Sequence, residues 1–340
     1  MSRAIARWSS AGLVVAIFVV GLAGFAQALR VSKAAGPIAI EATQIPSFDT
    51  RDPSTTRFGA LEFRGGLVLA SKAEAFGGIS SLHMEPDGAH FLAITDQGSW
   101  LRGRIVYSNG RPARIADAEM APILGTDGRP LAAHGWYDVE SLTERDGMFY
   151  IGIERVEQIV RLDYRRDGLQ ARGQAITVPA EFKTFTHNKS LECLTSPRQG
   201  ALAGQLIVVT EHSLDSAGNL RSFLLDGENV THFSVRRSDD FDVSDCTILP
   251  PGDLLLLERR ISPVRPAIRL RRIPLADLKA GALVDGRTMM EADLAYEIDN
   301  MEGIAVHRNA AGETIVTLVS DDNFSLIQRT LLLQFAVVGD

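Results

Sequence analysis

Residues 136–155, WYDVESLTERDGMFYIGIER, contain the repeating unit on which the fold prediction rests. A strand pattern with an acid inside it, WYDVESL, is followed by a turn at Asp146-Gly147 and then by the apolar run MFYIGI, which ends in charged residues. Two apolar runs separated by an Asp-Gly turn are typical of a β-hairpin. The unit therefore predicts two neighbouring strands of one antiparallel sheet.

Four further copies of this unit follow or precede it, each with a small or acidic residue in its first strand. The aligned residues are 60, 52, 53 and 57 positions apart, and they are Ser80, Glu140, Glu192, Asp245 and Glu302. The second strands end at Asp96, Glu154, Glu211, Glu258 and Asp321. A period near 50 residues with scarce helical patterning is typical of radially repeated sheets. We predict an all-β, five-bladed β-propeller, and residues 107–135 and 260–299 leave room for a sixth blade.

The ends of the repeat region predict how the ring closes. Residues 58–69 and 330–338 read as strands that lack a complete unit of their own. Pairing them in one blade would close the ring and leave no open sheet edge. We therefore expect a propeller domain over residues 58–340, preceded by a linker or arm at 29–57.

The N-terminus has the pattern of an export signal. Arg3 and Arg7 precede an apolar run at 11–25, and Ala26-Gln27-Ala28 is a small-x-small cleavage pattern. We predict a signal peptide over 1–28 and a periplasmic or secreted mature chain. An uncleaved membrane anchor is the alternative, because the run approaches the roughly 18 residues that a spanning helix needs.

Charge and cysteine content limit the partners and cross-links. A net charge of −7 argues against a nucleic-acid or anionic-membrane surface, so we expect a monomer with a small-molecule partner, and membrane association only if residues 1–28 are retained.

Cys193 and Cys246 each follow an aligned acid in neighbouring blades. A disulfide needs Cα atoms within roughly 4.4 to 6.8 Å. We expect these positions to lie farther apart, which favours two free thiols over one bridge.

Several segments together resemble the phytase-like family, which also carries the name "esterase-like activity of phytase". They are GGISSL (77–82), DVESL (138–142), NMEGIAV (300–306) and SDDNFSLIQRTLLLQF (320–335). The resemblance covers residues 58–338. It implies a secreted or periplasmic bacterial propeller with phosphoesterase or esterase activity.

Acids on the innermost strands would gather around the propeller axis, where like charges need a counter-charge. Ca²⁺ prefers oxygen ligands, so the candidate metal ligands are Glu140, Glu192, Asp245, Glu302, Asp96, Glu154, Glu211, Glu258 and Asp321. Arg155, Arg259 and His212 are the candidate catalytic residues, because cations stabilise the negative charge that develops on an ester. In the alternative interpretation these carboxylates lock the blades together, and the propeller binds a ligand or protein without catalysis.

We expect protein recovered from its native compartment to begin at or near Leu29, because the cleavage pattern ends at Ala28. Intact-mass measurement with N-terminal sequencing checks this. Recovery of a chain that begins at Met1, confined to the membrane fraction, would show instead that the segment is an anchor.

Overall fold

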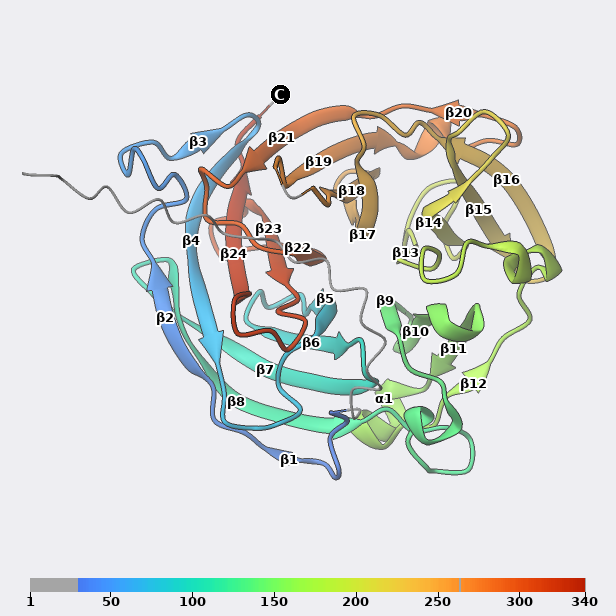
Figure 1. Cartoon of the computed structure of the whole chain (residues 1–340), viewed down its shortest axis with the longest axis horizontal. Helices are drawn as coiled ribbons and strands as arrows, with labels where there is room; N and C mark the ends of the chain where they lie inside the picture. The colour runs from blue at the N-terminus through green and yellow to red at the C-terminus, as the bar shows by residue number, and fades with distance from the viewer. Residues whose placement is uncertain (1–29, 263, 340) are drawn as a thin grey trace, which may run out of the picture.

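The computed structural model describes residues 30–262 and 264–339, and arranges five β-sheets radially around one axis (Figure 1). Each sheet is one blade of a propeller, so the predicted five-bladed all-β fold is confirmed. The predicted signal peptide lies outside the described residues. Within the described chain, no helix has the length and apolar character needed to cross a bilayer.

Three blades take their main strands from consecutive parts of the chain. From the outer edge to the axis, blade 1 contains β1 (Gly36–Pro37), β8 (Arg111–Pro122), β7 (Ser99–Ser108), β6 (His90–Thr95) and β5 (Ile79–Met84). In the same direction, blade 2 contains β12 (Gln174–Ala175), β11 (Gln158–Leu162), β10 (Met148–Ile153) and β9 (Val139–Arg145). Blade 4 contains β21 (Arg287–Asp293), β19 (Ala267–Pro274), β18 (Asp253–Arg260) and β17 (Asp242–Leu249).

The other two blades take strands from distant parts of the chain. Blade 3 contains β20 (Leu283–Val284), β16 (Asn229–Val235), β15 (Leu220–Asp226), β14 (Leu206–Leu214) and β13 (Cys193–Thr195). Blade 5 contains β2 (Glu41–Ile45), β4 (Leu61–Ala70), β24 (Thr330–Val337), β23 (Thr314–Ser320) and β22 (Met301–Arg308), with β3 (Arg57–Phe58) beside β4.

Closure of the ring depends on blade 5, as predicted. β4 and β24 pair antiparallel from Thr330 opposite Leu69 to Val337 opposite Leu61, and these strands lie side by side in Figure 1. The segment predicted as an arm adds β2 to this blade and β1 to blade 1. The first and last parts of the domain are therefore joined by backbone hydrogen bonds.

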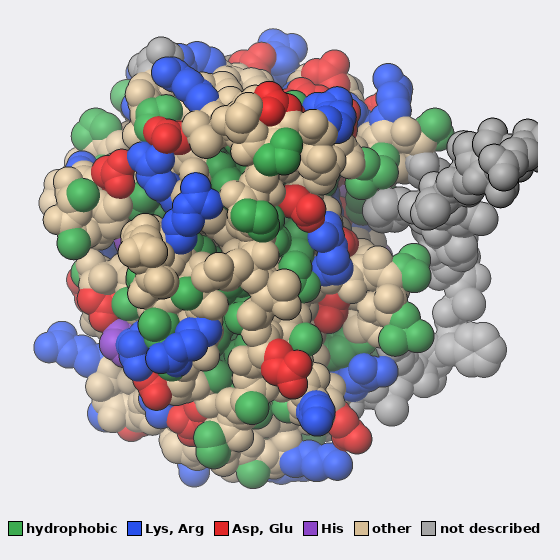
Figure 2. Space-filling model, turned by 90° about the vertical axis from the view of Figure 1, so that its left-hand side faces the viewer, with side chains coloured by type: hydrophobic (Ala, Val, Ile, Leu, Met, Phe, Trp, Pro, Cys, Tyr) green, Lys and Arg blue, Asp and Glu red, His purple; other side chains and the backbone are tan. Residues whose placement is uncertain are grey.

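Apolar side chains fill the spaces between neighbouring blades. The buried hydrophobic residues of the described chain form five clusters, and each cluster is shared by two adjacent blades. The innermost strands β5, β9, β13, β17 and β22 contact one another in a closed ring. The outer side near β2, β4 and β8 carries charges of both signs (Figure 2), including Arg64 paired with Glu62 and Glu313. Hydrophobic burial thus holds the blades together and leaves the axis to polar groups.

Cys193 and Cys246 form a disulfide with a Cα–Cα distance of 5.0 Å, so the prediction of two free thiols was wrong. The cysteines lie in β13 and β17, the innermost strands of blades 3 and 4. Blades of a propeller converge toward the axis, and their innermost strands therefore approach much more closely than their outer strands do. This convergence brings the two sulfur atoms within bonding distance.

Replacing both cysteines by alanine is expected to destabilise the fold by roughly 4 kcal/mol, because the disulfide closes a loop of 53 residues in the unfolded chain. The urea midpoint of the Cys193→Ala/Cys246→Ala variant should fall accordingly. Reductant should lower the midpoint of the wild type and leave that of the variant unchanged. Two titratable thiols in the unfolded, unreduced wild type would contradict the bond.

Candidate functional site

The pairing of first and second strands shows which residues occupy equivalent positions around the axis. In four blades the first strand has a one-residue bulge, formed by Ser80, Glu140, Ser244 and Glu302. On the second strands, the residues just past the pair that precedes the bulge are Asp96, Glu154, Arg259 and Asp321. Glu211, whose N–H donates to the Ser190 carbonyl, takes this position in blade 3. The innermost strands begin and the second strands end at one face of the ring, which we call the loop face.

Blade 4 is therefore shifted by one residue relative to the alignment made from sequence. Ser244 takes the position that the alignment gave to Asp245, and Arg259 takes the position that it gave to Glu258. A bulged residue is left unpaired and changes the strand register, which sequence similarity between the blades did not reveal. One cation thus replaces an acid in the ring of strand ends.

The two displaced acids stabilise contacts between strands. Asp245 accepts hydrogen bonds from Ser81 Oγ at 3.0 Å and from the backbone N–H of Ile304 at 2.8 Å, so it links blade 4 to blades 1 and 5. Glu258 is fully buried and paired with Arg269 at 2.7 Å and Arg271 at 2.6 Å. Both acids are fully engaged in these contacts and stand apart from the remaining carboxylates.

Three buried glutamates converge at the loop face end of the axis. Glu154, Glu192 and Glu211 each place one carboxylate oxygen within 4.8 Å of the other two. Each residue is less than 5% exposed, and Oε2 of Glu192 has no hydrogen-bond partner in the described structure. These residues form a candidate cation site, which we call the glutamate triad.

Arg259 is the central counter-charge of this region. Its guanidinium lies 3.4 Å from Glu192 Oε1 and 3.3 Å from Glu211 Oε1, and it also pairs with Glu302. Burial by itself lowers the pKa of Arg259, but Glu192 and Glu211 outweigh it and raise that pKa. Lys189 contributes a second cation, with Nζ 3.1 Å from the Glu211 carboxylate.

Burial raises the pKa of several acids near the loop face end of the axis, including Glu154 of the triad. Burial, followed by repulsion from Glu192, raises the pKa of Glu140 well above its usual range. Burial also raises the pKa of Glu154 to about 8, against a hydrogen bond from the Ser190 backbone, and that of Asp321 to about 7. In Asp96 burial again dominates the rise in pKa, followed by repulsion from Asp321. The region therefore favours protonation or a bound cation.

Sequence reasoning missed two acids beside the triad. Asp138 precedes the bulge of blade 2 and has a pKa raised by burial, which Arg155 opposes. Glu157 is half-buried, and burial raises its pKa to about 7. Both adopt positive φ angles, of 66° and 51°. The sequence does show a second acid, Glu157, three residues after Glu154. The short helical turn that brings Glu157 beside the triad could not be predicted from the sequence.

The other predicted catalytic residues lie around the triad at the loop face. Arg155 is exposed, with its guanidinium 4.4 Å from the ring centre of Tyr137. His212 is half-buried and lies 2.7 Å from Asp242, which also pairs with Arg237 at 2.7 Å. Arg155 is therefore the more available of the two for an anionic ligand, because His212 already has a carboxylate partner.

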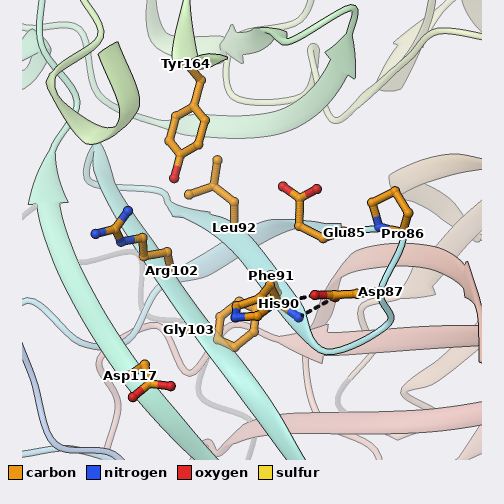
Figure 3. Close-up of a pocket in the computed structure, with 10 residues that line it drawn as sticks. All are labelled: Glu85, Pro86, Asp87, His90, Phe91, Leu92, Arg102, Gly103, Asp117 and Tyr164. Carbon is orange, nitrogen blue, oxygen red and sulfur yellow. Dashed lines mark hydrogen bonds and ion pairs between the residues drawn. The ribbon is translucent and has the colours of Figure 1, made fainter. Parts of the chain in front are cut away.

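A separate surface cavity of about 490 Å³ lies between blades 1 and 2 (Figure 3). Its charged side chains are mostly paired: His90 with Asp87 at 2.5 Å, Arg102 with Glu119, and Asp117 with Arg104. Glu85 points into this cavity from the hairpin between β5 and β6, at the opposite end of these strands from the loop face. The cavity is thus distinct from the glutamate triad.

Comparison with known proteins gives one family and a set of distant structural neighbours. The profile of the family described as "Phytase-like: Esterase-like activity of phytase" matches residues 74–324. No curated protein matches the chain. An aldose sugar dehydrogenase from Streptomyces coelicolor, in its PQQ-bound form, is 14% identical with a TM-score of 0.42, over 88% of this chain and 99% of that one. A glutaminyl cyclase from Myxococcus xanthus is 12% identical with a TM-score of 0.42, over 77% and 92% of the two chains.

Without added divalent cations, the free energy of unfolding is expected to fall as the pH rises from about 4.5 to about 8. The raised pKa of Glu154 means that the folded state holds this proton more tightly than the unfolded state. The contribution of this proton to the free energy of unfolding is fully present below the pKa of Glu154 in the unfolded chain. It is lost as the pH rises through the pKa of Glu154 in the folded chain. Urea midpoints measured across this range in chelator check the direction.

Glu154→Gln provides the control, because the amide keeps the shape of the side chain and cannot ionise. Its midpoint should depend less on pH over the upper part of this range than that of the wild type. A wild-type midpoint that stays constant or rises there would show that the buried carboxylates are better neutralised than their surroundings indicate.

Proposed function

The chain belongs to the phytase-like family of β-propellers, and on this basis we propose that it is an exported, cation-dependent hydrolase of phosphoric or carboxylic esters. The observation that carries the proposal is the convergence of Glu154, Glu192 and Glu211 within 4.8 Å beside Arg259, whose side chain is 11% exposed. The catalytic centre would lie at the loop face, where the predicted cationic residues surround the triad.

The side chains of the triad fit a hard divalent cation. Three carboxylates offer up to six oxygens, and Ca²⁺ takes six to eight oxygen ligands. The unpartnered Oε2 of Glu192 is a buried acceptor that a cation would satisfy. Arg259 and Lys189 neutralise only part of the surrounding charge, which also includes Glu140, Asp138 and Glu302. The donor set contains no sulfur or imidazole, and it therefore favours Ca²⁺ over softer metals.

A cation bound there would act as a Lewis acid toward an ester oxygen and lower the pKa of a bound water. The protein's own cations would stabilise the negative charge that develops on the substrate. Arg259 is held in place by three carboxylates, and this restricts its guanidinium to one orientation. Arg155 is exposed and free to meet a phosphate from the solvent side.

Glu157 is the best candidate for proton transfer. Its pKa of about 7 lies near neutral pH, where a group both gives and takes protons readily. It is half-buried with its Oε2 shielded from solvent, and it follows Glu154 by one short helical turn. We propose that Glu157 accepts a proton from the attacking water and delivers one to the leaving group.

The disulfide supports the exported location in this proposal. Disulfides persist in oxidising compartments and are rare in the reducing cytosol. Cys193 and Cys246 are bonded and buried in the innermost strands. The apolar run at 11–25, with its Ala-x-Ala pattern, is consistent with this location.

A non-catalytic propeller that binds a ligand or protein partner is the second candidate. It is favoured by Asp245 and Glu258, whose hydrogen bonds and ion pairs lock strands together and leave no free carboxylate oxygen for chemistry. In that case the triad would hold a structural cation, and the loop face would recognise a partner.

The direct test is hydrolysis of a generic aryl phosphate and an aryl acetate by the mature chain, with Ca²⁺ or with chelator. We expect Ca²⁺-dependent turnover that falls at least a hundredfold in Glu192→Gln. Ca²⁺ should also raise the stability of the wild type by about 2.7 kcal/mol at a hundredfold excess over Kd. Glu85→Gln, in the separate cavity, is the matched control and should behave as the wild type.

The three outcomes separate the candidates. Stabilisation by Ca²⁺ without turnover on either ester would favour the binding propeller. Turnover that persists in chelator would support hydrolysis and contradict its dependence on a cation. Neither stabilisation nor turnover would remove both the metal and the hydrolase proposals.

A further inference from the structure

Exposed hydrophobic side chains gather at one end of the blades. Among residues 30–262 and 264–339, the large hydrophobic residues that are exposed are Val156, Leu214, Ile261, Val264, Leu283, Leu294, Leu326 and Ile327. All except Leu283 and Leu294 lie at the end of a second strand or between that end and the start of a third strand. Leu326 is fully exposed, and Val264 is 85% exposed, so these side chains project into solvent.

The repeated topology places these six side chains on the loop face. They follow Glu154, Glu211, Arg259 and Asp321, which are equivalent positions in blades 2 to 5. We call the six side chains the aliphatic tips. They come from four separate connections on successive blades and so cover a broad area of one face.

Basic side chains accompany the aliphatic tips, although the whole chain is acidic. Arg155 and Arg265 are exposed in the same loops. The acids at the start of these loops, Glu154, Glu211 and Asp321, are buried. Exposed acids nearby are paired: Asp239 with Arg269 at 3.5 Å and Asp240 with Arg237 at 3.6 Å. The fully exposed charges without an ion pair beside the tips are therefore positive, while Glu157, Asp215 and Asp322 of the same loops are half-buried.

The described chain begins at the loop face, close in sequence to the N-terminal apolar run. The described chain begins at Arg30, whose backbone N–H donates to Gln97 and whose guanidinium lies 4.9 Å from the ring centre of Phe324. Phe324 belongs to the loop that carries Leu326 and Ile327. Only residues 26–29 separate Arg30 from the apolar run at 11–25, a span of at most about 18 Å when extended. Before cleavage, or in the anchor alternative, insertion of that run into a bilayer would hold the loop face close to the lipid surface.

We propose that the loop face docks on a lipid bilayer, with the aliphatic tips entering the interface and Arg155 and Arg265 meeting anionic headgroups. Isolated aliphatic side chains on several loops suit a fluid surface, which can adapt to each tip. Basic side chains add attraction to anionic lipids, and salt weakens that attraction. This docking does not depend on the proposed hydrolysis.

Flotation of the mature chain with lipid vesicles tests the proposal. All five blades lie within Gly36–Val337, so a chain that starts near Leu29 contains the complete fold. We expect it to float with phosphatidylcholine vesicles, and at least threefold more strongly when phosphatidylglycerol is included at low salt. Leu326→Ser/Ile327→Ser should weaken binding at least tenfold without lowering the melting temperature, because both side chains are exposed.

Leu283→Ser is the matched control, since Leu283 is exposed on the outer strand β20 and should not affect flotation. Absence of wild-type binding to both vesicle types would overturn the proposal, as would equal binding by the double variant. Concentration-dependent self-association that the double variant abolishes, in the absence of vesicle binding, would assign the surface to a second copy of the chain and also overturn it.

Discussion

The ion pairs of Arg259 with buried glutamates constrain the rest of the propeller. Its guanidinium pairs with Glu192, Glu211 and Glu302 near the axis, where charged groups have lost much of their hydration. Removing one partner from such a group leaves an uncompensated buried charge, which costs roughly 3 to 5 kcal/mol. Because Arg259 does not neutralise every nearby carboxylate, the region that links the blades is also the candidate cation site.

The apolar core determines where this charge lies. Hydrophobic clusters occupy the spaces between the blades, so hydrophobic burial drives their packing against one another. The innermost strands then meet at the axis, where their polar side chains must satisfy one another. Ser81 of blade 1 reaches Asp245 of blade 4 at 3.0 Å, a contact that is possible only because the axis is narrow. Convergence also explains the disulfide between blades 3 and 4.

The loop face combines two properties that arise from different parts of the sequence. Buried acids end the second strands, and exposed aliphatic and basic side chains follow them within the same loops. The candidate cation site therefore lies beneath the surface that we propose to dock on lipid. If both proposals hold, the esters nearest to the site are those of the interface itself, and Arg155 lies between the two environments.

Local patterns along the chain were enough to predict the propeller, its five blades and its closure, because a period near 50 residues and alternating strand patterns survive divergence between copies. They also identified Glu192 as an acid of the innermost strands and Glu154 and Glu211 as acids at the ends of the second strands. The assembled fold was needed to show that Arg259 replaces Glu258 among these strand ends, that Asp245 links blades, and that Cys193 meets Cys246. These outcomes depend on a one-residue bulge and on the distance between strands far apart in the chain. Both are set by the packing of the whole ring, because a shift of one residue turns a side chain to the opposite face of a strand.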